Sequence, residues 1–265
     1  MKEFGLQLFT IRDVFQTEDG IRDGFRAMAE YGYSYGQTAG GFLVPPEQFA
    51  KYAKDAGISI CGTHYSWDAM KNDPDGTMKI HEILGTTNIG IGGMPADARS
   101  LEGVKPFIEK ANELGAYFAK RGFKFTYHNH AFEFARQADG RTLMDHLVDG
   151  LDPVNCSFVL DTYWVQYGGY SVEKMIRRLA GRVDILHLKD MGANKSVELG
   201  NGKTMNVPYI TEIGNGNLNF DEIIPLAESL GTKYFVVEQD AGFSDGNSLH
   251  SIKTSADYIK KYLLK

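Results

Sequence analysis

Four polar residues lie where short apolar runs of the sequence end. Asp161 closes the run CSFVLD, His187 closes VDILH, Glu238 closes KYFVVE, and Glu133 lies just past FKFTYHNH. Carboxylate oxygen together with imidazole nitrogen suits a divalent cation, and manganese, cobalt, zinc and magnesium all remain open. A barrel that gathers its strand ends at one face would bring the four side chains together. We therefore expect Glu133, Asp161, His187 and Glu238 to share one metal ion.

Each of these residues, taken alone, has an ordinary structural explanation. Asp161 could cap the helix that follows its strand, His187 could be a hydrogen-bonded core histidine, Glu133 could lie on the surface, and Glu238 could pair with a lysine. The spacing favours the metal site, because 28 residues separate Glu133 from Asp161 and 26 separate Asp161 from His187, which is about one strand–loop–helix unit each. The set contains no cysteine, so it is not a structural zinc site of cysteines, and it leaves room for water or substrate.

The end of the fifth apolar run carries further imidazoles. His128 and His130 lie two residues apart, and alternation along a strand would point both to the same side. Both are candidates to line a pocket and to transfer protons, and one of them could replace Glu133 as a ligand. The structural alternative is a histidine that only hydrogen-bonds its neighbours.

Other polar residues near strand ends are candidates for substrate contacts. Lys189 follows His187 by two residues and could stabilise a developing enolate, or it could form a salt bridge with Asp190. His64 ends the run ISICGTH, and Gln7 lies within FGLQLF. Trp164 follows Asp161 closely, and its ring suits the apolar face of a sugar, although it could equally be packing.

Composition limits the classes of function. The chain has 265 residues, of which 43% are hydrophobic and 23% charged, and its formal net charge is -6. This charge, without a basic cluster, argues against a nucleic-acid partner. The two cysteines, Cys61 and Cys156, lie in apolar runs and are expected to be buried and free. We see neither a signal peptide nor a membrane-spanning stretch, so the cytoplasm is the expected location. A homo-oligomer remains possible.

The apolar runs that must position these residues alternate with helical patterns. Eight runs read as buried strands, as is typical of a sheet whose outer face is covered by helices: 4–9, 33–38, 58–64, 87–93, 123–130, 156–161, 183–189 and 234–239. Apolar stripes with helical spacing lie between several of them and after the last: 21–28, 104–118, 172–179, 220–230 and 252–263. This order predicts an α/β protein with one (β/α)8 TIM-barrel domain over 1–265.

A doubly wound open sheet is the alternative fold. It would normally carry a glycine-rich phosphate turn after an early strand, and none follows the first strand here. The cluster GIGG at 90–93 lacks that spacing, so we interpret it as strand-end packing. The connection from about 191 to 215 is rich in glycine and asparagine. We expect it to be a long loop over the active-site face that acts as a lid or contacts a partner.

The motifs together resemble the sugar phosphate isomerase/epimerase superfamily, the xylose isomerase-like TIM barrels. The resemblance follows the chain in order, through QLFTIRD, HNHAFEF, LDTYW, GRVDILHLKDM, VVEQD and SLHSIKTSADYIKKYL. The HNH-x-x-EF signature is similar to that of the branch of inosose dehydratases and enzymes that act on 3-keto-glycosides.

This resemblance implies one divalent metal held by Glu, Asp, His and Glu at the ends of strands five to eight. Asp161, His187 and Glu238 match that pattern. At the end of the fifth strand, better-known epimerases have a glutamate where this chain has His128. The resemblance therefore implies Glu133, the nearest acid, as the fifth-strand metal ligand, with His128 as the alternative ligand. At the second strand end relatives often have an acid, and here it is Gln37, which can orient a hydroxyl but cannot transfer a proton as an acid would.

We expect a metal-dependent isomerase or epimerase of a small keto- or hydroxy-sugar that works through an enediolate. The expected acid–base groups are Glu133 and Glu238, with His128 or His130 as substitutes and Lys189 holding the enediolate. A dehydratase or lyase of an inosose or 3-keto-glycoside is the alternative. Less favoured are a barrel that binds sugar without turnover and a DNA-repair endonuclease, which would need more metal ligands and a basic groove. The absence of a phosphate cradle favours a neutral sugar.

Overall fold

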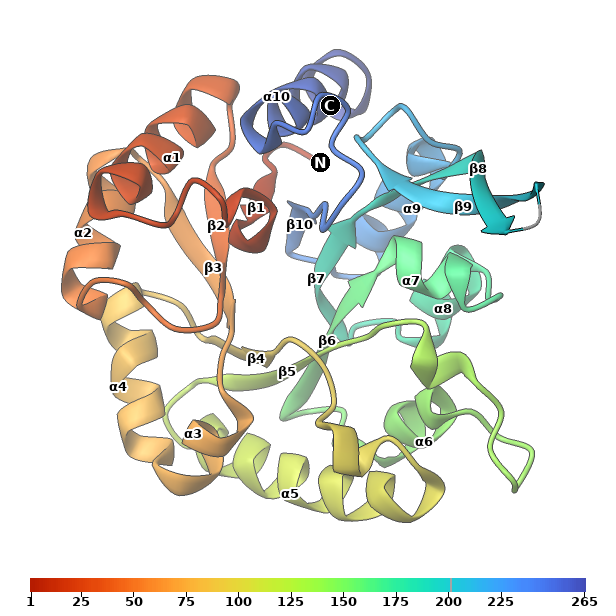
Figure 1. Ribbon diagram of the computed structural model, residues 1–265. Coiled ribbons are helices and arrows are strands. Elements are labelled where there is room, and N and C mark those ends of the chain that lie inside the picture. The colour runs from red at the N-terminus through yellow and green to blue at the C-terminus, as the bar shows by residue number, and fades with distance from the viewer. Residues whose placement is uncertain (201) are drawn as a thin grey trace.

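Eight parallel strands form a nearly closed barrel in the computed structural model, which describes residues 1–200 and 202–265 (Figure 1). The strands are β1 (Gly5–Gln7), β2 (Tyr35–Ala39), β3 (Ser59–His64), β4 (Asn88–Ile91), β5 (Lys124–His128), β6 (Cys156–Asp161), β7 (Val183–Leu188) and β10 (Tyr234–Val237). They pair in the order β3-β2-β1-β10-β7-β6-β5-β4. Each coincides with one of the eight predicted runs, β2 extending one residue beyond its run, so the predicted barrel is confirmed.

The barrel closes between β3 and β4. The amide of Tyr65 donates to the carbonyl of Gly90 over 2.6 Å. Gly90 belongs to the GIGG cluster, and a Cβ at this position would lie 2.3 Å from the carbonyl oxygen of Thr63. The cluster therefore serves the close approach of two backbones, which is the packing interpretation made from the sequence.

Helices surround the strands (Figure 1). They are α1 (Glu18–Tyr31), α2 (Pro46–Asp55), α3 (Trp67–Asn72), α4 (Pro74–Leu84), α5 (Leu101–Ala119), α6 (Leu143–Gly150), α7 (Thr162–Tyr167), α8 (Val172–Arg178), α9 (Phe220–Ser229) and α10 (Ser248–Tyr258), with short turns η1 (Leu8–Ile11), η2 (Ala96–Ala98), η3 (Phe132–Phe134) and η4 (Ile259–Leu263). The five predicted apolar stripes coincide with α1, α5, α8, α9 and α10–η4 and face the core.

Burial agrees with the expectation for a sheet covered on its outer face. Every residue of β6 and of β7 is buried. Cys61 and Cys156 are buried and free, as predicted. Among the described residues no helix is both long and apolar enough to cross a membrane.

The connection after β7 is a hairpin, which corrects the expectation of a structureless loop. Strand β8 (Asp190–Gly200) pairs in antiparallel fashion with β9 (Lys203–Thr211), with Val197 opposite Met205. Alternation of apolar and polar residues, visible around Val197 and Val207, is the strand signal that the glycines and asparagines obscured. Figure 1 shows the hairpin extending outward past α7 and α8, away from the centre of the barrel.

One buried carboxylate fixes the base of this hairpin. Asp190 accepts hydrogen bonds from the backbone amides of Met191, Gly214, Gly216 and Leu218 over 2.8 to 3.1 Å. A Cβ at Gly216 would lie 2.3 Å from the Asp190 carboxylate, so the approach needs glycine. Asp190 is therefore committed to the backbone, and the predicted salt bridge between Lys189 and Asp190 is not formed; Lys189 pairs with other acids, as described below.

We expect Asp190→Ala to lower the free energy of unfolding by about 2–5 kcal/mol, because several buried amides lose their acceptor at once. Glu198→Ala, on the same strand but exposed, should change it by less than about 0.5 kcal/mol. Urea unfolding measures both. Equal effects of the two substitutions would contradict the anchoring role of Asp190.

Candidate metal centre and active site

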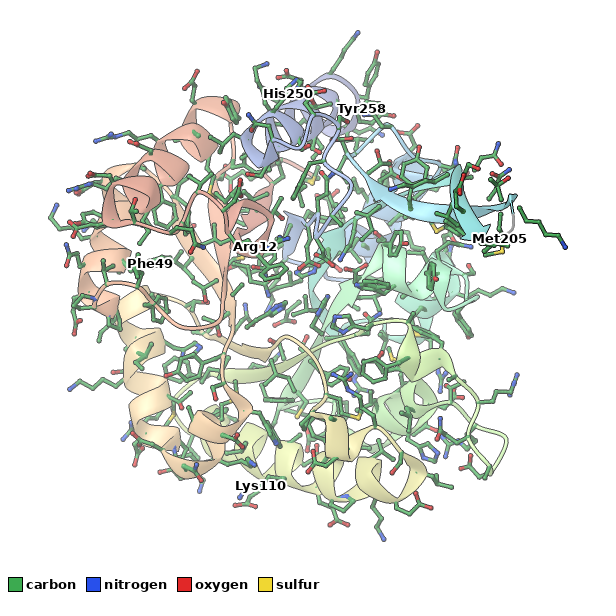
Figure 2. The ribbon with its side chains drawn as sticks, in the orientation of Figure 1. Arg12, Phe49, Lys110, Met205, His250 and Tyr258 are labelled. Atoms are coloured by element: carbon green, nitrogen blue, oxygen red, sulfur yellow. The ribbon has the colours of Figure 1, made fainter. Side chains whose placement is uncertain are left out.

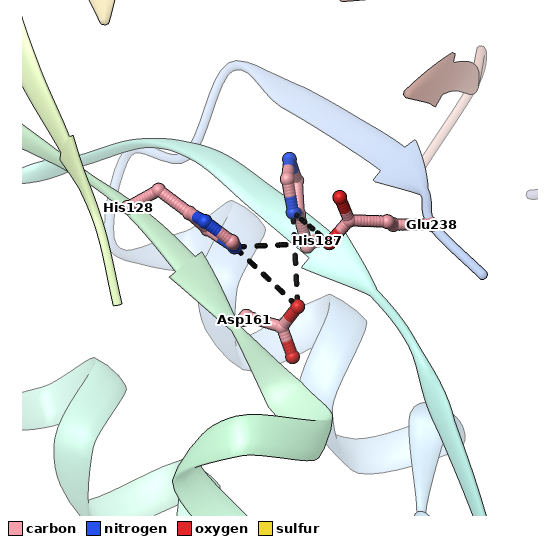
Figure 3. A group of neighbouring side chains, drawn as sticks. All are labelled: His128, Asp161, His187 and Glu238. Carbon is pink, nitrogen blue, oxygen red and sulfur yellow. Dashed lines mark hydrogen bonds and ion pairs between the residues drawn. The ribbon is translucent and has the colours of Figure 1, made fainter. Parts of the chain in front are cut away.

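Four buried side chains converge at the carboxyl ends of neighbouring strands (Figure 3). His128 and Asp161 end β5 and β6, His187 lies near the end of β7, and Glu238 directly follows β10. One potential ligand atom from each lies within 4.8 Å of all the others. The strand register explains the convergence, because Asp161 pairs with His187 and His187 with Val236 across adjacent ladders.

The facing atoms are two imidazole nitrogens and two carboxylate oxygens. Nδ1 of His187 lies 2.9 Å from Oε2 of Glu238 and 3.8 Å from Oδ2 of Asp161. Nε2 of His128 lies 3.5 Å from the same Asp161 oxygen and 3.7 Å from the same Glu238 oxygen. The four atoms thus surround one point.

The hydrogen bonds around the two imidazoles hold one nitrogen of each ring outward and turn the other toward the group. Nδ1 of His128 contacts the carbonyl of Gly92 at 3.1 Å, and Nε2 of His187 contacts Oε1 of Gln37 at 2.5 Å. Carbonyl oxygens only accept, so these nitrogens carry the protons. Such outer hydrogen bonds are the usual means of fixing the tautomer of a metal ligand. The other nitrogens face into the group: Nε2 of His128 has no hydrogen-bond partner among the described residues, and Nδ1 of His187 donates to Glu238 at 2.9 Å. A bound divalent ion would displace that proton.

Unpartnered buried atoms support the same fit. Nε2 of His128 and Oδ2 of Asp161 have no hydrogen-bond partner among the described residues, and leaving such atoms buried and unpaired costs free energy. The other Asp161 oxygen, Oδ1, accepts from the amide of Trp164 at 2.9 Å and caps α7. Asp161 therefore satisfies both sequence interpretations at once, since one oxygen caps a helix and the other is available to a metal.

Lys189 places a positive charge beside the group. It is fully buried, and its Nζ lies 3.2 Å from Glu238, 3.5 Å from Asp161 and 2.5 Å from Asp240. Burial lowers the pKa of Lys189, but these three carboxylates outweigh it, and the net pKa lies above its ordinary value. The ammonium also lies 4.8 Å from the centre of the Trp164 ring. Lys189 is thus a fixed cation at the edge of the site.

The charges shift the titration of the ligands themselves. Burial raises the pKa of Asp161 and of Glu238, but Lys189 and the neighbouring imidazoles outweigh burial, so both carboxyl groups have pKa values below the ordinary range. Burial lowers the pKa of His187, but Glu238 and Asp161 raise it to about 9. Both carboxylates are therefore ionised and ready to bind a cation at neutral pH.

The geometry favours His128 over Glu133 as the fourth ligand, so of the two candidates that the sequence left open we prefer His128. Glu133 is buried, and its carboxylate accepts from the hydroxyl of Tyr127 at 2.6 Å and from the amide of His130 at 2.9 Å. It is not one of the four residues whose ligand atoms converge. The reason is chain direction: Glu133 lies in the turn η3, past the end of β5, and its side chain is used to hold that turn.

The other predicted site residues lie around the group. The His64 ring stacks on His128 with centroids 4.8 Å apart. Gln7 donates to Gln37 at 3.0 Å, and Gln37 in turn contacts His187. These three polar side chains therefore form a layer on the side of the metal group toward β1, β2 and β3.

His130 and Trp164 lie on another side. The His130 ring centroid is 4.8 Å from that of His128 and 5.6 Å from that of Trp164. Burial and the nearby His128 lower the pKa of His130 to about 3. Its Nδ1 has no hydrogen-bond partner among the described residues, so His130 is a neutral imidazole beside the metal group.

Two residues of the site were missed in the sequence. Asp240 contacts Lys189 at 2.5 Å, and Asn129 accepts from the amide of Asp161 through its side-chain oxygen at 2.9 Å. Both belong to motifs that were noticed, VVEQD and HNHAFEF. The signal for Asp240 was its position two residues after Glu238, the same spacing that singled out Lys189 after His187.

A family model described as a xylose isomerase-like TIM barrel matches residues 25–262. The chain belongs to the xylose isomerase-like TIM-barrel family. This confirms the resemblance inferred from the motifs.

Relatives of this barrel differ in their reactions. The chain is similar to the inosose dehydratase of Clostridium perfringens, with 24% identity over 163 residues that make up 59% of this chain and 54% of that protein. It thus spans about half the length of the curated relatives it matches. A sugar phosphate isomerase/epimerase from Parabacteroides distasonis superposes with a TM-score of 0.80 at 23% identity over 100% of both chains. A D-allulose 3-epimerase from Methylomonas sp. gives 0.67 at 14% identity over 99% of this chain and 98% of that one. Because these sequence identities are below 25%, the likeness to the two solved structures shows the fold alone.

Burial makes Glu133 a source of pH-dependent stability. Burial raises the pKa of Glu133 from 4.5 to about 7, although the hydrogen bond from Tyr127 lowers this pKa. The folded state therefore holds the proton more tightly than the unfolded state, so this contribution is fully present below about pH 4.5 and is lost as pH rises through 7. The shift corresponds to about 3 kcal/mol.

We expect Glu133→Gln, which mimics the protonated side chain, to remove this part of the pH dependence. Denaturant unfolding between pH 5 and pH 8 should show a smaller decline in the free energy of unfolding for the variant than for the natural chain. The exposed Glu102→Gln should leave the decline unchanged. Parallel profiles for Glu133→Gln and the natural chain would contradict this account.

Proposed function

We propose that this chain is a divalent-metal-dependent enzyme that removes a proton next to the carbonyl of a small keto- or hydroxy-sugar and forms an enediolate. The observation that carries this proposal is the convergence of two imidazole nitrogens and two ionised carboxylates beside the buried cation of Lys189. When bound, a divalent ion would polarise the carbonyl and acidify the neighbouring carbon. His128, Asp161, His187 and Glu238 would hold it.

Three residues are candidates for proton transfer and for stabilising the charge of the enediolate. Glu238 is the candidate base, because Asp161 is already committed to capping α7 through its second oxygen. Lys189 offers a positive charge that would stabilise the oxygen anion of the enediolate. His130 is neutral and not one of the four converging residues, so it is the candidate for the second proton transfer, in which it would first take up a proton from solvent or substrate and then return it. Its ring lies near those of His128 and Trp164, at the edge of the group.

The enediolate can lead to two kinds of product. Return of the proton gives an epimer or an aldose–ketose isomer, which we propose as the main reaction. Loss of a β-hydroxyl from the enediolate gives dehydration, which is the second candidate because the curated relatives are inosose dehydratases. The two imidazoles favour zinc, cobalt or manganese over magnesium, which prefers oxygen ligands.

Exchange of substrate protons with deuterated water tests the shared step. The metal-loaded chain is incubated in deuterated water with a panel of keto-sugars and inososes. We expect deuterium to appear at the carbon beside the carbonyl, and NMR detects it. An epimer or isomer in the product supports the main reaction, and an unsaturated or deoxy ketone supports dehydration. His130→Gln should slow the reaction by about 10²–10⁴-fold, with metal content unchanged.

Two controls separate catalysis from binding. Asp161→Ala should abolish both exchange and metal retention, whereas the exposed His250→Ala, which lies on α10, should affect neither (Figure 2). If sugars bind to the metal-loaded chain but no member of the panel exchanges, the proposal fails and a sugar-binding barrel without turnover is the better description.

A further inference from the structure

One cavity of the barrel is lined by none of the four residues of the proposed metal centre. It lies at the carboxyl ends of β1 and β2, toward helices α1 and α2, and has a volume of about 190 Å³. Most of its lining residues are apolar, among them Phe9, Phe15, Phe42 and Phe49, and the polar ones are Arg12, Gln16 and Thr38. An engineered apolar cavity of about 150 Å³ binds benzene. This cavity therefore has room for a group the size of one ring.

Strand alternation separates the cavity from the metal group. Gln37 and Thr38 are consecutive in β2, so their side chains point to opposite sides of the strand. Gln37 points inward and contacts His187. Thr38 lines the cavity instead, so an occupant would lie behind the second strand rather than on the metal.

Arg12 supplies a positive charge at this cavity. Its Nη1 donates to the carbonyl of Phe9 at 2.8 Å and its Nη2 to the carbonyl of Asp240 at 2.9 Å, and the guanidinium lies 4.2 Å from the centre of the Phe9 ring. Both acceptors are uncharged, and within residues 1–200 and 202–265 no carboxylate forms an ion pair with Arg12. Figure 2 shows Arg12 nearer the centre of the barrel than Phe49, so the charge lies on the inner side of the cavity.

The unused donors of Arg12 define the group it could bind. A guanidinium carries five N–H donors in one plane, and two are engaged here. Those that remain match the two oxygens of a carboxylate, which guanidinium groups bind in a bidentate manner. The stacking on Phe9 and the two carbonyl contacts hold the guanidinium in place, which lowers the entropy cost of binding.

Thr38 is the second, independent sign of a ligand. Its side chain is 2% exposed, and Oγ1 has no hydrogen-bond partner among the described residues. A buried hydroxyl without a partner destabilises the fold, and valine would fill the same space without that cost. Because Oγ1 is buried, a small movement of the Thr38 side chain on binding would bring this hydroxyl to a ligand oxygen, which would be its missing partner.

We propose that this cavity binds a small organic carboxylate with an apolar body the size of one ring. Arg12 would bind the carboxylate, the phenylalanine side chains would enclose the apolar body, and Thr38 would hydrogen-bond to the ligand. The site is separate from the proposed metal centre and does not depend on the reaction proposed above.

Benzoate is the probe, titrated by calorimetry into the full chain after metal removal with a chelator, so that the metal cannot bind it. We expect a Kd of about 1 mM or tighter. Benzamide has the same ring without the charge and should bind at least about 10-fold more weakly. Arg12→Gln should weaken benzoate binding by at least about 10-fold, whereas Arg26→Gln, an exposed arginine of α1 that pairs with Asp23, should leave it unchanged.

Thr38→Val provides a readout that a purely structural role would not give. The variant should melt at a higher temperature, because the unpaired hydroxyl is gone, and should bind benzoate more weakly. The proposal is overturned if the natural chain does not bind benzoate at 10 mM (about tenfold above the expected Kd), or if Arg12→Gln and Thr38→Val both bind it as tightly as the natural chain. Because the measurement uses the metal-free chain, its failure leaves the proposed sugar reaction untouched.

Discussion

Three carboxylates around one buried ammonium are the constraint on which the site depends. Asp161, Glu238 and Asp240 all lie within 3.5 Å of Nζ of Lys189. The three carboxylates and the ammonium carry a formal net charge of −2, which a divalent cation would neutralise. Without a cation, the proton that His187 binds with a pKa of about 9 offsets part of the excess. The chain thus buries a charge arrangement that is most favourable when a metal is bound.

The barrel makes this arrangement possible because its strands are parallel and in register. The carboxyl ends of β5, β6 and β7 and the residue after β10 meet at one level. Hydrogen bonds from the neighbouring strands then orient the ligands: Gly92, after β4, fixes His128, and Gln37, in β2, fixes His187. The glutamine at the second strand end, a departure from the pattern of relatives, thereby has a positioning role toward the metal ligand.

The sequence was sufficient for the barrel, because apolar runs ending in polar residues recur at the spacing of a strand–helix unit. It was also sufficient to expect that Asp161, His187 and Glu238 converge, because each directly ends a buried run; their role as metal ligands stays a prediction. It favoured Glu133 over His128 because it records residue types and not the direction of a side chain beyond a strand end. Only the structure shows that Glu133 folds back onto Tyr127 and the His130 amide.

The hairpin and the contacts of Lys189 could not be predicted for a related reason. Glycine and asparagine between residues 191 and 215 indicated a loop, whereas the pairing of β8 with β9 depends on partners many residues apart. A salt bridge of Lys189 with its neighbour Asp190 was one of two interpretations left open, but that carboxylate binds the backbone amides at the base of the hairpin. Competition between local and distant partners is decided by tertiary packing, which a single sequence does not record.

The central claim is that His128, and not Glu133, completes the metal site. X-ray absorption spectroscopy of the chain loaded with Co²⁺ measures it most directly, because imidazole ligands give a distinct scattering pattern. We predict two imidazoles on the cobalt in the natural chain and in Glu133→Gln, and one in His128→Ala. A single imidazole in the natural chain, or a change of the cobalt ligands in Glu133→Gln with none in His128→Ala, would contradict the account.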